Sequence, residues 1–117
     1  MDLLQELQYK TKMLDTSIKQ LRKTGSEYAK AYTDYRVALA KELIQLKNEG
    51  YAITLAGDIA RGKPDIAKLK FEEISKEAIY KANLESINAI KLEIKIIQEQ
   101  ISREWTNDWK RVLYNER

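Results

Sequence analysis

The chain has 117 residues, of which 44% are hydrophobic and 33% charged, and it contains neither Cys nor His. One domain is expected at this length, the apolar fraction is too high for a disordered linker, and a formal charge of +3 in mixed sign permits an acidic partner without requiring one. Without Cys or His, the thiolate nucleophile, the commonest general base and the commonest zinc ligands are missing, so we expect a non-enzymatic protein with no cofactor and no metal site.

Residues 2–48 are predicted to form one long helix, because apolar side chains recur at alternating steps of three and four. Segment 24–27 resembles a helix stop followed by a capping box, centred on Gly25. However, the heptad from Leu21 to Tyr28 stays in register across this glycine, which favours one helix with a kink at most. The stripe comprises Leu4, Leu7, Leu14, Ile18, Leu21, Tyr28, Tyr32, Tyr35, Leu39 and Leu46.

Residues 49–63 are predicted to connect this helix to a second one. Gly50 supplies the left-handed position that commonly follows a helix. Thr54 is placed to cap a short helical turn over residues 55–61, and Gly62 ends that turn.

The segment from Gly57 to Lys63 matches the first seven positions of the phosphate-binding loop pattern. The next position should supply a hydroxyl for magnesium, but it is Pro64, which has neither a hydroxyl nor a backbone N–H. No other segment has the pattern of the parallel sheet that such a loop requires. We therefore interpret these glycines as turn residues.

A second long helix is predicted over residues 64–104, with Pro64 in its first turn and Asp65 near its positive end. Five isoleucines then follow in unbroken steps of three and four, a pattern that favours association of more than two helices, and Asn83 in the same stripe is predicted to fix the packing register. A short C-terminal helix over residues 105–114 carries two tryptophans that are costly to leave in water. The predicted oligomer interface comprises Ile87, Ile90, Ile94, Ile97, Ile101, Trp105 and Trp109.

These elements predict an all-α fold, a long antiparallel helical hairpin with coiled-coil-like packing, in which residues 1–117 form a single domain. Two helices that meet along one stripe leave part of the isoleucine face in water. Burial of apolar area contributes roughly 25 cal/mol per Å², so we expect oligomerisation to complete the fold as a helical bundle.

Two candidate binding surfaces follow from the pattern. Loops on a rigid scaffold often carry recognition, so the connection is predicted to bind another protein. Its apolar anchors are Tyr51 and Ile53, and its polar contacts are Asp58, Arg61 and Lys63. The alternative surface is a basic face of the first helix that contacts nucleic-acid phosphates, although acidic residues border it. That face comprises Lys12, Lys19, Lys23 and Lys30.

Tyrosines at heptad spacing add a related possibility. Tyr28, Tyr32 and Tyr35 could stack on nucleic-acid bases. Their spacing places them in the helix packing first, near an edge where water or a polar side chain reaches the hydroxyls.

Four stretches resemble a group of small uncharacterised helical proteins encoded by bacteriophages and prophages of Gram-positive bacteria: 38–41 (ALAK), 54–62 (TLAGDIARG), 86–93 (SINAIKLE) and 101–105 (ISREW). The resemblance covers residues 36–105. It implies a phage origin, with no established activity and no catalytic residue.

The expected location is the cytoplasm of the bacterial host. Residues 1–6 contain no basic segment that leads into an apolar core, and no apolar run approaches the roughly 20 residues that span a bilayer. The expected function is that of a phage-encoded adaptor or inhibitor, which binds a host or phage protein and further copies of itself. The alternative is a nucleic-acid-binding accessory protein of phage replication or recombination.

Overall fold

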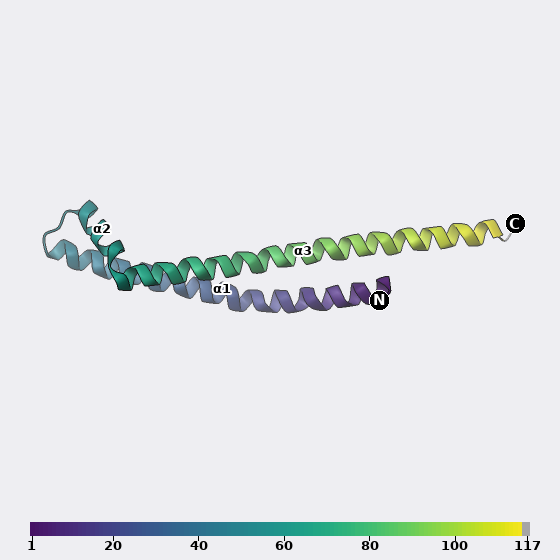
Figure 1. The fold of residues 1–117 in the computed structure, drawn as a ribbon, viewed down its shortest axis with the longest axis horizontal. Coiled ribbons are helices and arrows are strands. Elements are labelled where there is room, and N and C mark those ends of the chain that lie inside the picture. The colour runs from purple at the N-terminus through teal and green to yellow at the C-terminus, as the bar shows by residue number, and fades with distance from the viewer. Residues whose placement is uncertain (116–117) are drawn as a thin grey trace. The chain divides into compact units, whose positions relative to one another are not determined.

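The computed structural model describes residues 1–115, so the last two residues of the predicted domain lie outside it. Three helices form this part of the chain: α1 (Leu3–Asn48), α2 (Ile53–Gly62) and α3 (Pro64–Asn115) (Figure 1). No strand occurs within the described residues. The predicted all-α fold is confirmed.

The helices pack as two compact units. The first unit contains residues 1–20 and the described residues from 83 onward, and the second unit contains residues 21–82. Both α1 and α3 contribute a part to each unit.

Contacts inside the first unit show that its two helices run antiparallel. Lys10 of α1 forms an ion pair of 2.5 Å with Glu93 of α3. Further along α1, the Ser17 carbonyl accepts a hydrogen bond of 3.1 Å from the Asn83 side chain. Residue numbers therefore rise along α1 as they fall along α3. Asn83 makes the polar contact in the seam that the sequence pattern predicts.

The second unit has the same antiparallel sense. Tyr28 of α1 donates a hydrogen bond of 3.2 Å to Glu77, in the first third of α3. Near the end of α1, Glu42 pairs with Lys63, the residue that precedes α3. The predicted helical hairpin is confirmed in these contacts.

The start and the continuity of α1 follow from local chemistry. The Gln5 N–H donates to Asp2 Oδ1 (2.8 Å) and the Asp2 N–H donates to Gln5 Oε1 (3.1 Å), which is a reciprocal cap. α1 continues through Gly25, as predicted. At Gly25 a Cβ would lie 3.3 Å from the Tyr80 ring, so the glycine allows that ring to approach closely.

α1 ends in a Schellman motif. Gly50 has φ of 95°, the Gly50 N–H donates to the Lys47 carbonyl (3.0 Å), and the Tyr51 N–H donates to the Leu46 carbonyl (3.2 Å). The predicted left-handed glycine is confirmed.

α2 is longer than predicted. It begins at Ile53 after the N-cap residue Ala52, and no side chain caps it. Thr54 lies inside the first turn, so its predicted role as a cap is wrong.

α3 begins at Pro64 as predicted, but it continues unbroken to Asn115. The predicted end at residue 104 and the separate helix over 105–114 are therefore wrong. The Thr106 hydroxyl donates to the Ser102 carbonyl one turn earlier (2.9 Å), within the helix, instead of capping a new one.

Small residues allow α2 to pack closely on α1. Ala56 and Ala60 of α2 are buried with Leu46 of α1, and three partly buried residues surround them: Leu39, Leu43 and Ile59. This cluster fixes α2 against the end of α1 in the second unit. Among the described residues, the helices all lack a stretch long and apolar enough to cross a membrane.

Candidate protein-interaction site

The isoleucine row packs inside the first unit. Ile87, Ile90 and Ile97 are buried, and Ile94 and Ile101 are half-buried. The assignment of this row to an interface between subunits therefore needs correction, because α1 of the same chain supplies the helix that covers it. The exposed apolar residues of this stretch, Leu92 and Ile96, lie off the seam.

The two tryptophans of the predicted interface have a different environment. Trp105 is 70% exposed and Trp109 is 59% exposed. They lie on the part of α3 that extends past the start of α1 within the first unit (Figure 1).

The connection between the long helices presents apolar side chains at the surface. Tyr51 and Ile53 are exposed, as expected of partner-binding anchors, and Ile53 is 77% exposed. In contrast to Ile53, three small residues of α2 are buried: Ala56, Gly57 and Ala60. The helical part of the connection is therefore longer than predicted, and it positions Ile53 at its first turn.

The three polar residues predicted for this site differ in what they contact. Asp58 and Arg61 are exposed, and the Arg61 guanidinium lies over Gly57, 2.9 Å from where a Cβ would stand. Lys63 is half-buried and paired with Glu42, and the hydrogen bond to Glu42 raises the pKa of Lys63. Lys63 therefore ties the start of α3 to α1, and its role in partner binding stays a prediction.

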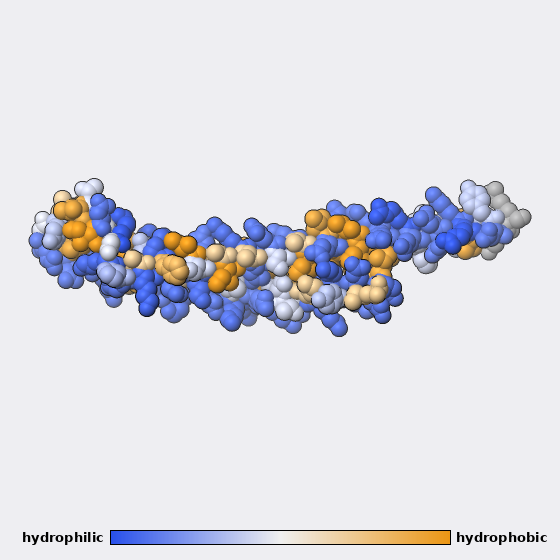
Figure 2. Space-filling model, viewed as in Figure 1, coloured by the Kyte–Doolittle hydropathy of each residue, from blue (hydrophilic) through white to orange (hydrophobic). Residues whose placement is uncertain are grey.

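A shallow apolar hollow lies between α2 and the end of α1. Its lining consists of Leu43, Ile44, Lys47, Ile53 and Ala56, and its volume is about 160 Å³. The space-filling view shows hydrophobic residues gathered at the end of the second unit that carries α2 (Figure 2). We call these five residues the tip site.

Sequence reasoning missed the α1 residues of the tip site. Leu43 and Ile44 fall between the heptad positions Leu39 and Leu46, and Ile44 is 62% exposed. An apolar residue outside the stripe of an otherwise regular amphipathic helix was the available signal.

The four predicted nucleic-acid-binding lysines are divided between the two units. Lys12 and Lys19 belong to the first unit, and Lys23 and Lys30 to the second. All four are exposed. However, Lys19 pairs with Asp15 at 2.9 Å.

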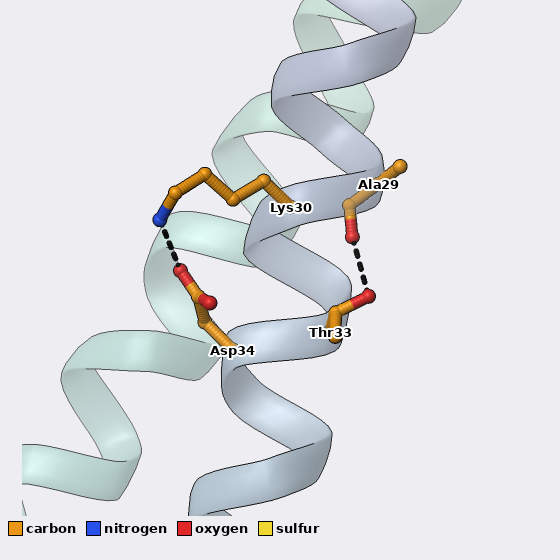
Figure 3. A network of polar contacts seen from close by, with 4 residues as sticks. All are labelled: Ala29, Lys30, Thr33 and Asp34. Carbon is orange, nitrogen blue, oxygen red and sulfur yellow. Dashed lines mark hydrogen bonds and ion pairs between the residues drawn. The ribbon is translucent and has the colours of Figure 1, made fainter.

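Lys30 is also paired on its own helix. It bonds Asp34 at 2.6 Å, beside a Thr33 hydroxyl that donates to the Ala29 carbonyl (Figure 3). The hydrogen bond to Asp34 raises the pKa of Lys30. Two of the four lysines therefore have a local carboxylate that offsets their charge.

The heptad tyrosines lie in and beside the packing of the second unit. The Tyr28 and Tyr80 rings are 5.8 Å apart, and burial raises the pKa of Tyr28, with a further contribution from Glu77. Tyr35 is buried, while Tyr32 is exposed beneath the guanidinium of Arg36. These tyrosines do not share one exposed face, so they form no continuous stacking platform.

A polar cluster missed by sequence reasoning accompanies the tyrosines. Glu73 is buried and bonded to Lys70 at 3.0 Å. The Lys70 ammonium also lies 4.8 Å from the centre of the Tyr35 ring, so it contacts both the Glu73 carboxylate and the face of that ring. Glu77 accepts from Tyr28 and pairs with Lys81 at 2.6 Å, and the hydrogen bond to Lys81 lowers the pKa of Glu77.

The segment that matches the phosphate-binding loop pattern lies in a helix. Gly57 to Gly62 belong to α2, so their backbone N–H groups serve helix packing and not a phosphate cradle. Within residues 1–115, no group of three or more acidic side chains is placed to hold a metal ion. Comparison with protein-family models, curated proteins and solved structures gave no match.

Proposed function

We propose that this chain is a non-enzymatic, phage-encoded adaptor or inhibitor that binds another protein through the tip site in the cytoplasm of the bacterial host. The observation that carries the proposal is the exposure of Ile44 and Ile53 on either side of one apolar hollow. The phage origin rests on the resemblance of the four sequence stretches.

The size and lining of the tip site favour a protein partner over a small molecule. Pockets for small ligands usually enclose about 300–1,000 Å³, whereas this hollow measures about 160 Å³. A space of this size suits an apolar side chain inserted from a partner surface. Lys47 at the rim adds a positive charge, so the partner is expected to present an apolar residue with a carboxylate nearby.

The hollow is held in place before binding. Ala56 and Ala60 pack on Leu46 beneath it, and Lys63 pairs with Glu42 at the end of α2. A preorganised site loses less conformational entropy on binding than a flexible loop does.

Affinity capture from phage-infected cells tests the proposal. The double variant Ile44→Glu, Ile53→Glu is expected to lose the partner that the wild-type chain retains, because two carboxylates enter the apolar hollow. Ile74→Glu is the matched control, since Ile74 is an exposed isoleucine of α3 outside the tip site. Retention of the same partner by the double variant contradicts the proposed function.

The alternative function is nucleic-acid binding through the lysines of α1, and their exposure is the observation that favours it. Phosphate contacts lose affinity steeply as salt rises. If this alternative holds, binding to DNA or RNA weakens strongly between about 50 and 200 mM salt, and Lys19→Glu with Lys23→Glu abolishes it. No measurable binding at low salt removes the alternative.

A further inference from the structure

The last part of α3 has no helix packed against it within the described chain. α1 begins at Leu3, and the pairing of Lys10 with Glu93 places that start near residue 100 of α3. From residue 102 to residue 115 every residue is exposed. This segment continues the packed part of α3 and presents its side chains to water. We call residues 102–115 the α3 extension.

The α3 extension carries an apolar face. Trp105, Trp109 and Val112 follow the half-buried Ile101 at steps of four, four and three, which places all four within an arc of about 80° on a helix. Leu113 lies one turn after Trp109. All members of this face beyond Ile101 are exposed, and a hollow of about 250 Å³ lies among Trp105, Asp108, Trp109 and Val112.

This face continues the side of α3 that packs on α1. Ile97 is buried and Ile101 is half-buried under the start of α1. Trp105 follows one turn later, beyond the start of α1, and is exposed. The extension therefore has the surface for an antiparallel helix partner, and no helix of residues 1–115 covers it.

We propose that the partner is a second copy of this chain, whose α3 extension pairs antiparallel with the first about a two-fold axis near Trp109. A second extension then follows the track and direction of α1, so it repeats the packing that α3 already uses. Trp105 of each copy lies opposite Leu113 of the other, which sets a large side chain against a smaller one. Asp108, which pairs with Arg111 of its own helix at 2.8 Å, lies within one residue of the level of Arg111 of the other copy, and these charges are opposite.

The available area agrees with a weak dimer. An aromatic side chain buries roughly 150–250 Å², so four tryptophans with the adjoining valine and leucine bring the total to on the order of 1,000 Å². That is the lower end of the range for specific interfaces. We therefore expect self-association in the micromolar range rather than a permanent assembly.

Intrinsic fluorescence with light scattering tests the proposal directly. The chain has two tryptophans, and both lie in the α3 extension. As the protein concentration rises from about 1 µM to about 1 mM, the tryptophan emission maximum is expected to shift to the blue while the mass measured by light scattering doubles. A constant monomer mass with unchanged emission over this range overturns the proposal.

A pair of variants separates this inference from the tip site. Trp109→Lys is expected to keep the chain monomeric. Its helix content and melting temperature are expected to equal those of the wild-type monomer, because Trp109 is exposed within its own chain. Ile53→Lys is the control, since it changes the tip site and is expected to dimerise like the wild type. Dimerisation of Trp109→Lys as tight as that of the wild type overturns the proposal, whatever the outcome for the tip site.

Pyrene labels on single cysteines test the antiparallel sense, and the absence of native Cys makes the labelling specific. Near the axis, labels on Asp108→Cys, at the edge of the apolar face, lie about 3 Å apart along the helices and give excimer emission. Labels on Ser102→Cys lie about 21 Å apart along the helices and give none. Excimer emission of equal strength from both variants indicates parallel pairing and contradicts the proposed arrangement.

Discussion

Two isoleucines on the same helix have opposite environments. Ile90 is 4% exposed and Ile96 is 51% exposed, although both belong to a segment rich in isoleucine. The steps of three and four place Ile90 on the face toward α1, whereas Ile96 lies off that stripe. At single residues, therefore, position in the helical period and not residue type determines burial.

This difference gives matched substitutions. Ile90→Ala is expected to lower the free energy of unfolding by about 2–5 kcal/mol, because it leaves a cavity in the packing of the first unit. Ile96→Ala is expected to change it by less than about 0.5 kcal/mol. Denaturant titration measures both, and equal losses would mean that the isoleucine row is not buried within the chain.

Two glycines provide a second matched pair. Gly50 has a positive φ, whereas Gly62 is the last residue of α2, with open space around it. Gly50→Ala is expected to cost about 1–2 kcal/mol because a Cβ strains the left-handed conformation. Gly62→Ala is expected to stabilise by about 0.4–1 kcal/mol because it restricts the unfolded chain. Thermal melts of the two variants that shift in the same direction contradict this account.

At the scale of elements, periodicity predicted the long helices and local chemistry decided their ends. The register across Gly25 predicted one continuous α1, which the structure confirms. The start of α2 was mispredicted because Ala52, which cannot cap through its side chain, precedes it. The break before Trp105 was mispredicted, since α3 continues through this point and the Thr106 hydroxyl donates to the Ser102 carbonyl within the helix.

The candidate site was predictable only in part. Tyr51 and Ile53 stand out as apolar residues in a glycine-bounded connection, and both are exposed. Ile44 was missed because its role depends on α2 folding back beside α1. The pairing of Lys63 with Glu42 could not be predicted because it joins residues far apart in sequence.

The packing of α2 gives a prediction at this scale. Ala60 has no exposed surface, so Ala60→Leu is expected to destabilise by about 1–3 kcal/mol through overpacking and to displace α2. Ala67→Leu is the control, since Ala67 is exposed on α3. Hydrogen exchange is expected to accelerate in α2 for Ala60→Leu alone. Unchanged exchange in α2 would show that the alanine packing does not hold this helix.

At the scale of the whole molecule, ion pairs and hydrogen bonds join α1 and α3 in both units. Lys10 with Glu93 serves the first unit, and Tyr28 with Glu77 and Glu42 with Lys63 serve the second. Such contacts fix which residues lie opposite one another, whereas the apolar stripe alone permits slippage by a heptad.

The shifted pKa values of the paired groups predict how stability depends on pH. The pKa of Glu77 lies below its ordinary value of 4.5, so its contribution is present above that pH and is lost as pH falls through the lowered pKa. The pKa values of Lys63, Lys70 and Lys81 lie above 10.5, so their contributions are present below pH 10.5 and are lost as pH rises through the raised values. Denaturant melts are expected to show a plateau between about pH 5 and pH 10 that falls on both sides. In Glu77→Gln, the free energy of unfolding is expected to fall less as the pH drops below about 5. A fall as steep as that of the wild type would contradict the role of Glu77.

α1 and α3 pair antiparallel within one chain, and a crosslink between them tests this pairing most directly. In the native chain the Asn83 side chain contacts the Ser17 carbonyl at 3.1 Å, and no native Cys interferes. On mild oxidation at low protein concentration, the double variant Ser17→Cys, Asn83→Cys is expected to form a disulfide within the monomer. The control Ser17→Cys, Ala89→Cys is expected to form none. Disulfide-linked dimers in place of the crosslinked monomer, or equal crosslinking of the control, would contradict the account.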